Sequence, residues 1–184
     1  MDKRRLIIGL IIIFAIPLYI WIAYYEIPNK AEVGEGKLQQ KPLNHNFATV
    51  LPFENEYMGD NSNTNGLVES LPLSEFKGTI EMDPEQHSLL VHYNANTVEL
   101  DGQAEQAVLY NSTAAFVLLG NLQEFTMQFT DESFTVKRIQ VESWFGTEFN
   151  DLKDPDIFEE KVQNPIGAAG AEKWFEVYTG GKMK

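Results

Sequence analysis

The sequence predicts an α+β fold in which helices pack on an antiparallel sheet of about four strands, with one N-terminal transmembrane helix before it. Three observations support this prediction. Two pairs of short segments alternate apolar and polar residues around turn signals, which is typical of β-hairpins. Segments with helical spacing lie before, between and after these pairs. One apolar run near the N-terminus is long enough to cross a bilayer.

An uncharged apolar run covers residues 6–25 and predicts a transmembrane signal-anchor helix. A helix of about 20 residues, at ~1.5 Å per residue, matches the thickness of a bilayer's hydrocarbon core. Three basic residues at positions 3–5 precede it, so residues 1–5 are expected to form a cytoplasmic stub and the rest of the chain to lie outside. A cleaved signal peptide is the alternative, but residues 21–26 contain no A-x-A-like site, which favours a retained anchor.

Two regions follow the anchor. Residues 26–53 contain scattered Pro, Gly and polar residues without sustained periodicity, which predicts a flexible linker. Residues 47–53 are the part of this linker that is a candidate for packing on the domain. Residues 54–184 are expected to form one extracytoplasmic α+β domain, which is long enough to bury a core without disulfides.

The domain is expected to begin with a short helix and a hairpin. Residues 60–65 offer several N-cap side chains, apolar residues follow at one-face spacing, and Pro72 limits the helix to about two turns. Residues 79–82 alternate as in a strand, and residues 83–86 have turn chemistry. Residues 88–93 are rich in residues that suit a second strand, which completes the hairpin.

A second helix and a second hairpin are expected in the middle of the domain. The helix lies between Gly102 and Gly120, where apolar residues share one stripe. Residues 125–129 alternate apolar and polar side chains and predict a strand. Residues 134–144 predict its partner, with a β-bulge near residues 137–138 because the apolar parity shifts by one residue there.

The C-terminal part is expected to be helical at first. Asp154 and Pro155 can open a short helix that runs through residue 162 and ends before Pro165. The residues at 172–179 form a last element whose type the sequence leaves open. The predicted order is therefore helix, hairpin, helix, hairpin, helix.

Composition excludes several classes of function. The 184 residues include no Cys, which rules out disulfides, cysteine-bound metals and a lipid-bearing cysteine. The formal net charge of −13 argues against a nucleic-acid partner, whose binding face would be basic. His87 and His92 are expected on opposite faces of one strand and His45 in the linker, so the histidines predict no metal site. We expect no metal and no cofactor.

No catalytic motif is present in the sequence. It has neither a G-x-S-x-G nucleophile elbow nor a glycine-rich phosphate loop. Glu81 with Glu142, or Asp154 with Asp156, could resemble the carboxylate pair of a glycosidase. Solvated surface charge is the favoured interpretation of these carboxylates, so no catalytic residue is predicted.

Two local runs are candidates for an interaction surface. The polar run at residues 57–66 places asparagines at positions 1, 3 and 5 of a calcium loop, but it lacks the first Asp and the Glu at position 12. Helix capping is therefore favoured there. Aromatic residues at 144–145, 174–175 and 178 predict either a contact patch or core packing. The candidate surface residues are Tyr57, Asp60, Asn61, Asn63, Trp144 and Phe145.

Several of these runs together resemble a known family. They are Tyr57–Asn63, Leu71–Leu73, Thr79–Met82, Leu90–Tyr93, Ala114–Leu119 and Ser143–Gly146. The pattern resembles an uncharacterised family of Gram-positive extracytoplasmic domains, catalogued only as domain of unknown function 4825, over about residues 54–150. The resemblance implies a surface-anchored domain, found alone or fused to membrane sensor proteins, and it implies no catalytic residues.

These observations predict a non-enzymatic binding or accessory domain, anchored in the cell membrane and lying outside it. Its role would be protein interaction or envelope sensing, and its partner an envelope or membrane protein. One alternative is an envelope hydrolase that acts on cell-wall polymer through a carboxylate pair formed by folding. Another is a surface domain that binds divalent cations on its acidic face.

Overall fold

The structure is a computed structural model that describes residues 14–22 and 34–181. The chain divides into two compact units, Met1–Leu38 and Gln39–Lys184. In the first unit, residues 14–21 and 34–38 are helical. No helix within the described ranges has both the length and the apolar character needed to cross a membrane. The predicted cytoplasmic stub, and the parts of the predicted span at 6–13 and 23–25, lie outside these ranges.

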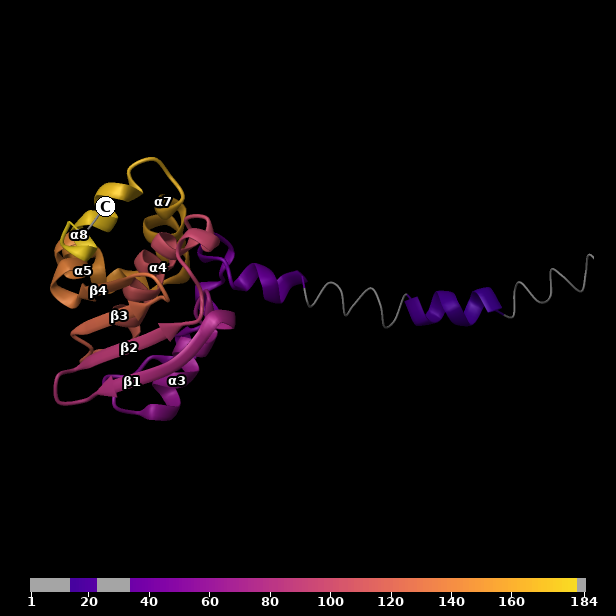
Figure 1. Ribbon diagram of the computed structural model, residues 1–184, viewed down its shortest axis with the longest axis horizontal. Coiled ribbons are helices and arrows are strands. Elements are labelled where there is room, and N and C mark those ends of the chain that lie inside the picture. Colours follow the sequence, from indigo (N-terminus) through magenta and orange to yellow (C-terminus); the bar gives the residue numbers. More distant parts are fainter. Residues whose placement is uncertain (1–13, 23–33, 182–184) are drawn as a thin grey trace, which may run out of the picture. The chain divides into compact units, whose positions relative to one another are not determined.

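The second unit is built around a four-stranded sheet with the order β1-β2-β3-β4 (Figure 1). Its strands are β1 (Lys77–Asp83), β2 (Ser88–Tyr93), β3 (Glu124–Gln128) and β4 (Ser133–Lys137). β1 pairs antiparallel with β2, and β3 with β4, so both predicted hairpins are confirmed. β2 and β3 run parallel, so the sheet is mixed and the prediction of an antiparallel sheet is wrong.

The parallel pair follows from the helix that joins the two hairpins. α4 (Gln103–Leu118) lies between β2 and β3 in the sequence, as predicted. A crossover helix of this length returns the chain to the same end of the sheet, so the next strand runs in the same direction as the last one.

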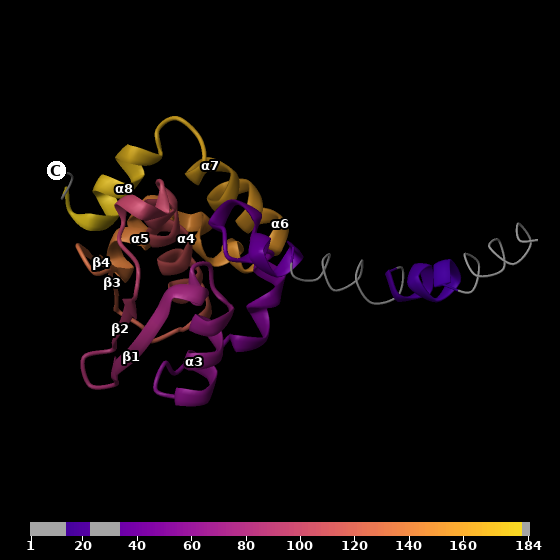
Figure 2. The same cartoon turned by 45° about the vertical axis from the view of Figure 1, so that its right-hand side comes forward.

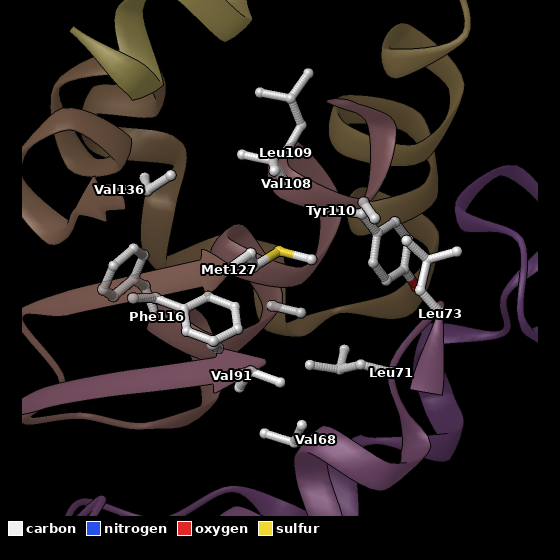
Figure 3. Packing of buried hydrophobic residues seen from close by; sticks show 14 of the residues in the cluster. Val68, Leu71, Leu73, Val91, Val108, Leu109, Tyr110, Phe116, Met127 and Val136 are labelled. Carbon is white, nitrogen blue, oxygen red and sulfur yellow. The ribbon is translucent and has the colours of Figure 1, made fainter. Parts of the chain in front are cut away.

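α4 is the centre of the core, because nearly every residue from Ala104 to its end is buried. Figure 3 shows its side chains Val108 and Phe116 among the sheet residues Val91 and Met127. A helix that is apolar around most of its circumference needs packing partners on several sides. The sheet covers one side of α4, and the C-terminal helices and the N-terminal segment of this unit cover the others.

Among the residues of this unit that the structure describes, helices cover one face of the sheet. In Figure 2 the strands lie along the left side of this unit and α3, α4 and α6 lie to their right. On the opposite face, strand pairing aligns Glu81, Leu90, Thr126 and Thr135 in one row. The hydroxyl oxygens of Thr126 and Thr135 are 2.9 Å apart there. This polar face is open to solvent, as is common in sheets with one buried side.

The segment from residue 39 to residue 53 is folded as part of the second unit, although the sequence assigned it to the linker. It forms three short helices, η2 (Pro42–Asn44), η3 (Phe47–Thr49) and η4 (Leu51–Phe53). The ring of Phe47 stacks on that of Phe158, with centroids 3.7 Å apart. The packed part therefore begins before residue 47, and residues 26–33 of the predicted linker lie outside the described ranges.

Two predictions about the first half of the domain have different outcomes. The first predicted helix is confirmed as α3 (Asn61–Ser70), with η5 (Ser74–Phe76) between it and β1. The prediction that His87 shares a strand with His92 is wrong, because His87 lies in the turn before β2 with a φ of 52°. The short helix η6 (Val98–Leu100) leads from β2 to α4.

The predicted strand at 134–144 is confirmed only as far as residue 137, and the predicted bulge is wrong. β4 ends at Lys137, and α5 (Arg138–Phe145) follows it directly. The shift in apolar parity marks the point where the side-chain period changes from 2, as in a strand, to 3.6, as in a helix. Arg138, Val141 and Phe145 therefore lie on the inner side of α5. The Gln140 side chain accepts a hydrogen bond from the Lys137 N–H at 2.7 Å and so stabilises the first turn of α5.

The C-terminal part is helical throughout. η7 (Gly146–Lys153) leads to the predicted helix at 155–162, which is confirmed and continues further, through α6 (Pro155–Phe158), η8 (Glu159–Gln163) and α7 (Asn164–Ile166). η8 is a π-turn, and its wider spacing accommodates Pro165, which has no N–H to donate. The element of open type is a helix, α8 (Ala171–Thr179).

Candidate functional site

The carboxylates that could resemble a glycosidase pair have other partners in the structure. Glu81 Oε1 lies 2.9 Å from His92 Nε2 on the β1 side of the sheet. Glu142 Oε1 lies 3.3 Å from Arg138 Nη1 on α5, which follows the strand at the other edge. Asp154 caps α6, accepting a hydrogen bond from the Asp156 N–H at 2.9 Å. Within the described ranges, no three His, Asp or Glu side chains are grouped so that they could hold a metal ion.

The polar run at residues 57–66 forms a helix start. The Asp60 side chain accepts a hydrogen bond from the Asn63 N–H at 3.2 Å, as an N-cap does. The Asn63 side-chain amide donates to the Phe53 carbonyl at 2.7 Å. Asn61 is exposed in the first turn of α3, and Tyr57 is 66% exposed before it. The capping interpretation is confirmed, and of the predicted surface residues in this run Tyr57, Asp60 and Asn61 are exposed, whereas Asn63 is half-buried.

The predicted aromatic residues lie at the contact between α5 and α8. The Trp144 ring stacks on that of Trp174 with centroids 5.4 Å apart, and Phe145 meets Trp174 edge-on at 5.6 Å. Trp174 is buried, whereas Trp144 keeps 38% of its surface exposed. Figures 1 and 2 place α3 at the bottom of the unit and α5 and α8 at the top. The six predicted surface residues therefore belong to two separate places.

A groove that the sequence did not predict lies between the first half of α4, α7 and the start of α8. Its volume is about 410 Å³. It is lined by Gly102, Glu105, Gln106, Leu109, Ile166, Ala171, Glu172 and Phe175. The α4 members recur three or four residues apart, so they share one face of that helix. We call this feature the α4–α8 groove.

The α4–α8 groove combines an apolar floor with an acidic rim. Leu109, Ile166 and Phe175 belong to the buried core and form the floor. Glu105 and Glu172 are exposed and lie in the first turns of α4 and α8, where the helix dipole favours a carboxylate. In the part of the chain that the structure describes, neither carboxylate takes part in an ion pair.

A second cavity, of about 320 Å³, lies between the N-terminal segment and the helical run at 155–166. His45, which the sequence placed in a flexible linker, is buried beside it. Its Nδ1 lies 2.7 Å from the Tyr110 hydroxyl oxygen and its Nε2 lies 2.7 Å from the Ser70 carbonyl oxygen. Since both ring nitrogens have partners, His45 holds the segment in place and is not available to a ligand.

The groove could not be predicted from the sequence because it is formed by three elements that are distant in the chain. The spacing of Glu105 and Leu109 is visible in the sequence, but it is typical of any helix face. The spacing of Trp174, Phe175 and Tyr178 is the signal that could have identified α8, since these residues share one helical face.

One comparison with known proteins gives a match. A family model described as "Domain of unknown function (DUF4825)" matches residues 50–141, which is half of the chain. The matched residues include α3, the four strands and α4. α7 and α8, which complete the groove, lie beyond them. No curated protein and no solved structure matches.

Proposed function

Since the chain belongs to the DUF4825 family, whose function is unknown, we propose a function from its geometry: it is a non-enzymatic binding domain whose ligand occupies the α4–α8 groove. The observation that supports this proposal is the groove itself, with its apolar floor of Leu109, Ile166 and Phe175. Small clefts that are mainly apolar and carry a few oriented polar groups are the usual form of a ligand site. A groove of 410 Å³ has the volume of such a site.

The domain would act outside the cell membrane, where an envelope or membrane protein is its partner. The sequence supports this placement through the apolar run at 6–25 and the basic residues at 3–5. All but one of the acidic residues follow the run, so the domain is strongly acidic. An acidic surface is repelled by anionic lipid head groups, which favours a protein partner over the membrane surface itself.

The two sides of the groove differ in whether the family model matches them, and this difference suits a binding role. The α4 side lies inside the residues that match the family model, and the α7 and α8 side lies outside them. The shared half supplies a rigid wall, because most of α4 is packed into the core. The other half supplies the contacts that would distinguish the ligand of this chain.

Methyl NMR on the full chain in detergent tests the proposal. Small neutral aliphatic and aromatic compounds are added, and the methyl signals of Leu109 and Ile166 report on the groove. Ile139, which is exposed on α5 and does not line the groove, is the control signal. We expect some compounds to shift the groove methyls in a saturable way and to leave Ile139 unchanged. If no compound shifts the groove methyls, or if Ile139 shifts equally, the α4–α8 groove is not a binding site.

A further inference from the structure

We propose that the occupant of the α4–α8 groove is a peptide segment of a partner protein that presents one large apolar side chain next to a Lys or Arg. This inference rests on the proposed function, and it names the class of ligand. The apolar side chain would lie on the floor, and the basic side chain would meet the carboxylates at the rim.

The charge of the rim determines the sign of the ligand's charge. Glu105 and Glu172 belong to different helices but line the same groove. Among the described residues that line the groove there is no Arg or Lys, so the charged groups of this lining are both carboxylates. An anionic ligand would be repelled, whereas a basic group beside the apolar contact is complementary to both parts of the site.

The floor determines the size of the apolar part. Leu109, Ile166 and Phe175 come from three different helices and converge at the base of the groove. The space above them suits one large aliphatic or aromatic side chain with its adjoining backbone. A folded surface would need a much larger contact area, since stable protein interfaces bury on the order of 800 Å² per partner.

The helix ends on the groove favour a peptide over a simple amine. The N-cap residues of α4 and α8 are glycines, Gly102 and Gly170, so neither helix has a capping side chain. N–H groups in the first turn of a helix without a capping side chain can donate to an outside acceptor. Peptide carbonyl groups are such acceptors, whereas an alkylamine has none.

Titration of the full chain in detergent with short blocked peptides tests this inference. The probes are acetylated and amidated tetrapeptides in which a central leucine is followed by lysine, by glutamine or by glutamate. Binding is followed by the Leu109 and Ile166 methyl signals. We expect the lysine peptide to bind at least about ten-fold more tightly than the glutamate peptide, with a preference that weakens at high salt.

Charge variants separate the rim from the overall charge of the domain. Glu105→Gln and Glu172→Gln are each expected to weaken the lysine peptide about two- to five-fold and to leave the glutamine peptide unchanged. Glu99→Gln removes an exposed carboxylate that does not line the groove, and it is the matched control. Thermal melting of each variant verifies that it is folded.

The outcomes distinguish the two proposals. If the neutral and lysine peptides bind equally and the Glu105 and Glu172 variants have no effect, the basic ligand is wrong, while the binding groove remains. If hexylamine binds as tightly as the lysine peptide, the ligand is a cationic amphiphile and not a peptide. If neither peptides nor neutral compounds shift the groove methyls, both proposals are wrong.

Discussion

His45 and Tyr110 connect the N-terminal segment of the folded unit to its central helix, with His45 Nδ1 2.7 Å from the Tyr110 hydroxyl oxygen. The other ring nitrogen, Nε2, faces the Ser70 carbonyl, which can only accept, so Nε2 carries the proton. Nδ1 therefore accepts from the Tyr110 O–H. Every hydrogen-bonding group of the neutral imidazole has a partner, and burial lowers the pKa of His45 below its ordinary value.

This arrangement predicts that the domain loses stability as the pH falls. The unfolded His45 titrates near pH 6.5, and the folded one at lower pH because burial disfavours its charge. Below about pH 6.5 the unfolded chain therefore binds the proton more readily, so the free energy of unfolding falls by up to ~1.4 kcal/mol per pH unit until the folded pKa is reached.

Urea unfolding at pH 7.5 and 5.5 measures this loss. His45→Gln removes the titrating group and should reduce the difference between the two pH values, whereas His92→Gln should keep it. Asp156 and Glu159 line the cavity next to His45, and both side chains are present in all three proteins. Equal pH dependence in the wild type and in His45→Gln would contradict the prediction.

Arg138 is predicted to be the most sensitive charged residue for stability. Its side chain is only 11% exposed and donates to three backbone carbonyls, those of Phe116, Leu119 and Leu122. These bonds supply donors to the Phe116 carbonyl in the last turn of α4 and to the Leu119 and Leu122 carbonyls just after it. Arg138→Met removes all three donors, although the Leu119 carbonyl keeps its bond from the Leu122 N–H, and it should cost ~2–4 kcal/mol in the free energy of unfolding.

The neighbouring Lys137 provides the comparison for Arg138. Its side chain is 61% exposed and its Nζ lies 4.0 Å from Glu124 Oε2, so Lys137→Met should change the free energy of unfolding by less than ~0.5 kcal/mol. Chemical denaturation of the two variants under the same conditions gives the difference. A loss of similar size in both variants would show that the carbonyl bonds of Arg138 are not important for stability.

Gly66 is predicted to be intolerant of alanine although it lies inside a helix. At such a position Gly→Ala normally stabilises by ~0.5–1 kcal/mol. Here a Cβ atom would overlap the Phe53 ring, so Gly66→Ala should instead destabilise by ~1–3 kcal/mol. Gly59→Ala is the matched control, because its Cβ would lie an ordinary 3.7 Å from Pro84 Cβ. If thermal melting shows Gly66→Ala to be more stable than the wild type, the packing of Phe53 on α3 is wrong.

The hydrogen bond between Thr113 and Tyr178 is predicted to fix α8 on α4. The two hydroxyl oxygens are 2.8 Å apart, and Thr113 also donates to the Leu109 carbonyl at 2.7 Å. Tyr178→Phe removes one buried bond and leaves Thr113 satisfied, so it should cost ~1 kcal/mol. A double-mutant cycle with Thr113→Val measures the coupling, and a coupling near zero would contradict this contact.

Local signals in the sequence were sufficient for the elements that depend on neighbours in the chain. The cap at Asp60, the turn between the first two strands and the stripe on α4 each predicted an element that the structure contains. The beginning of α5 was mistaken for a strand because Phe134 and Val136 alternate up to its first residue. The helical period becomes visible only after that point.

Long-range features could not be predicted in the same way. The parallel pairing of β2 and β3 depends on the side of the sheet on which α4 returns. The packing of residues 39–53 depends on Phe158 and Tyr110, which lie more than 60 residues further along the chain. The α4–α8 groove requires that Leu109, Ile166 and Phe175 lie close together, and their spacing in the sequence does not indicate that they do.

The central claim is that the α4–α8 groove binds the ligand, and blocking the groove tests it most directly. Ala171→Phe places a ring among the lining residues, whereas Ala168→Phe places the same ring on the exposed loop beside them. The affinity of the lysine peptide is measured for both variants in the full chain. We predict at least a ten-fold loss for Ala171→Phe and less than a two-fold change for Ala168→Phe. Equal affinity in the two variants would contradict the claim.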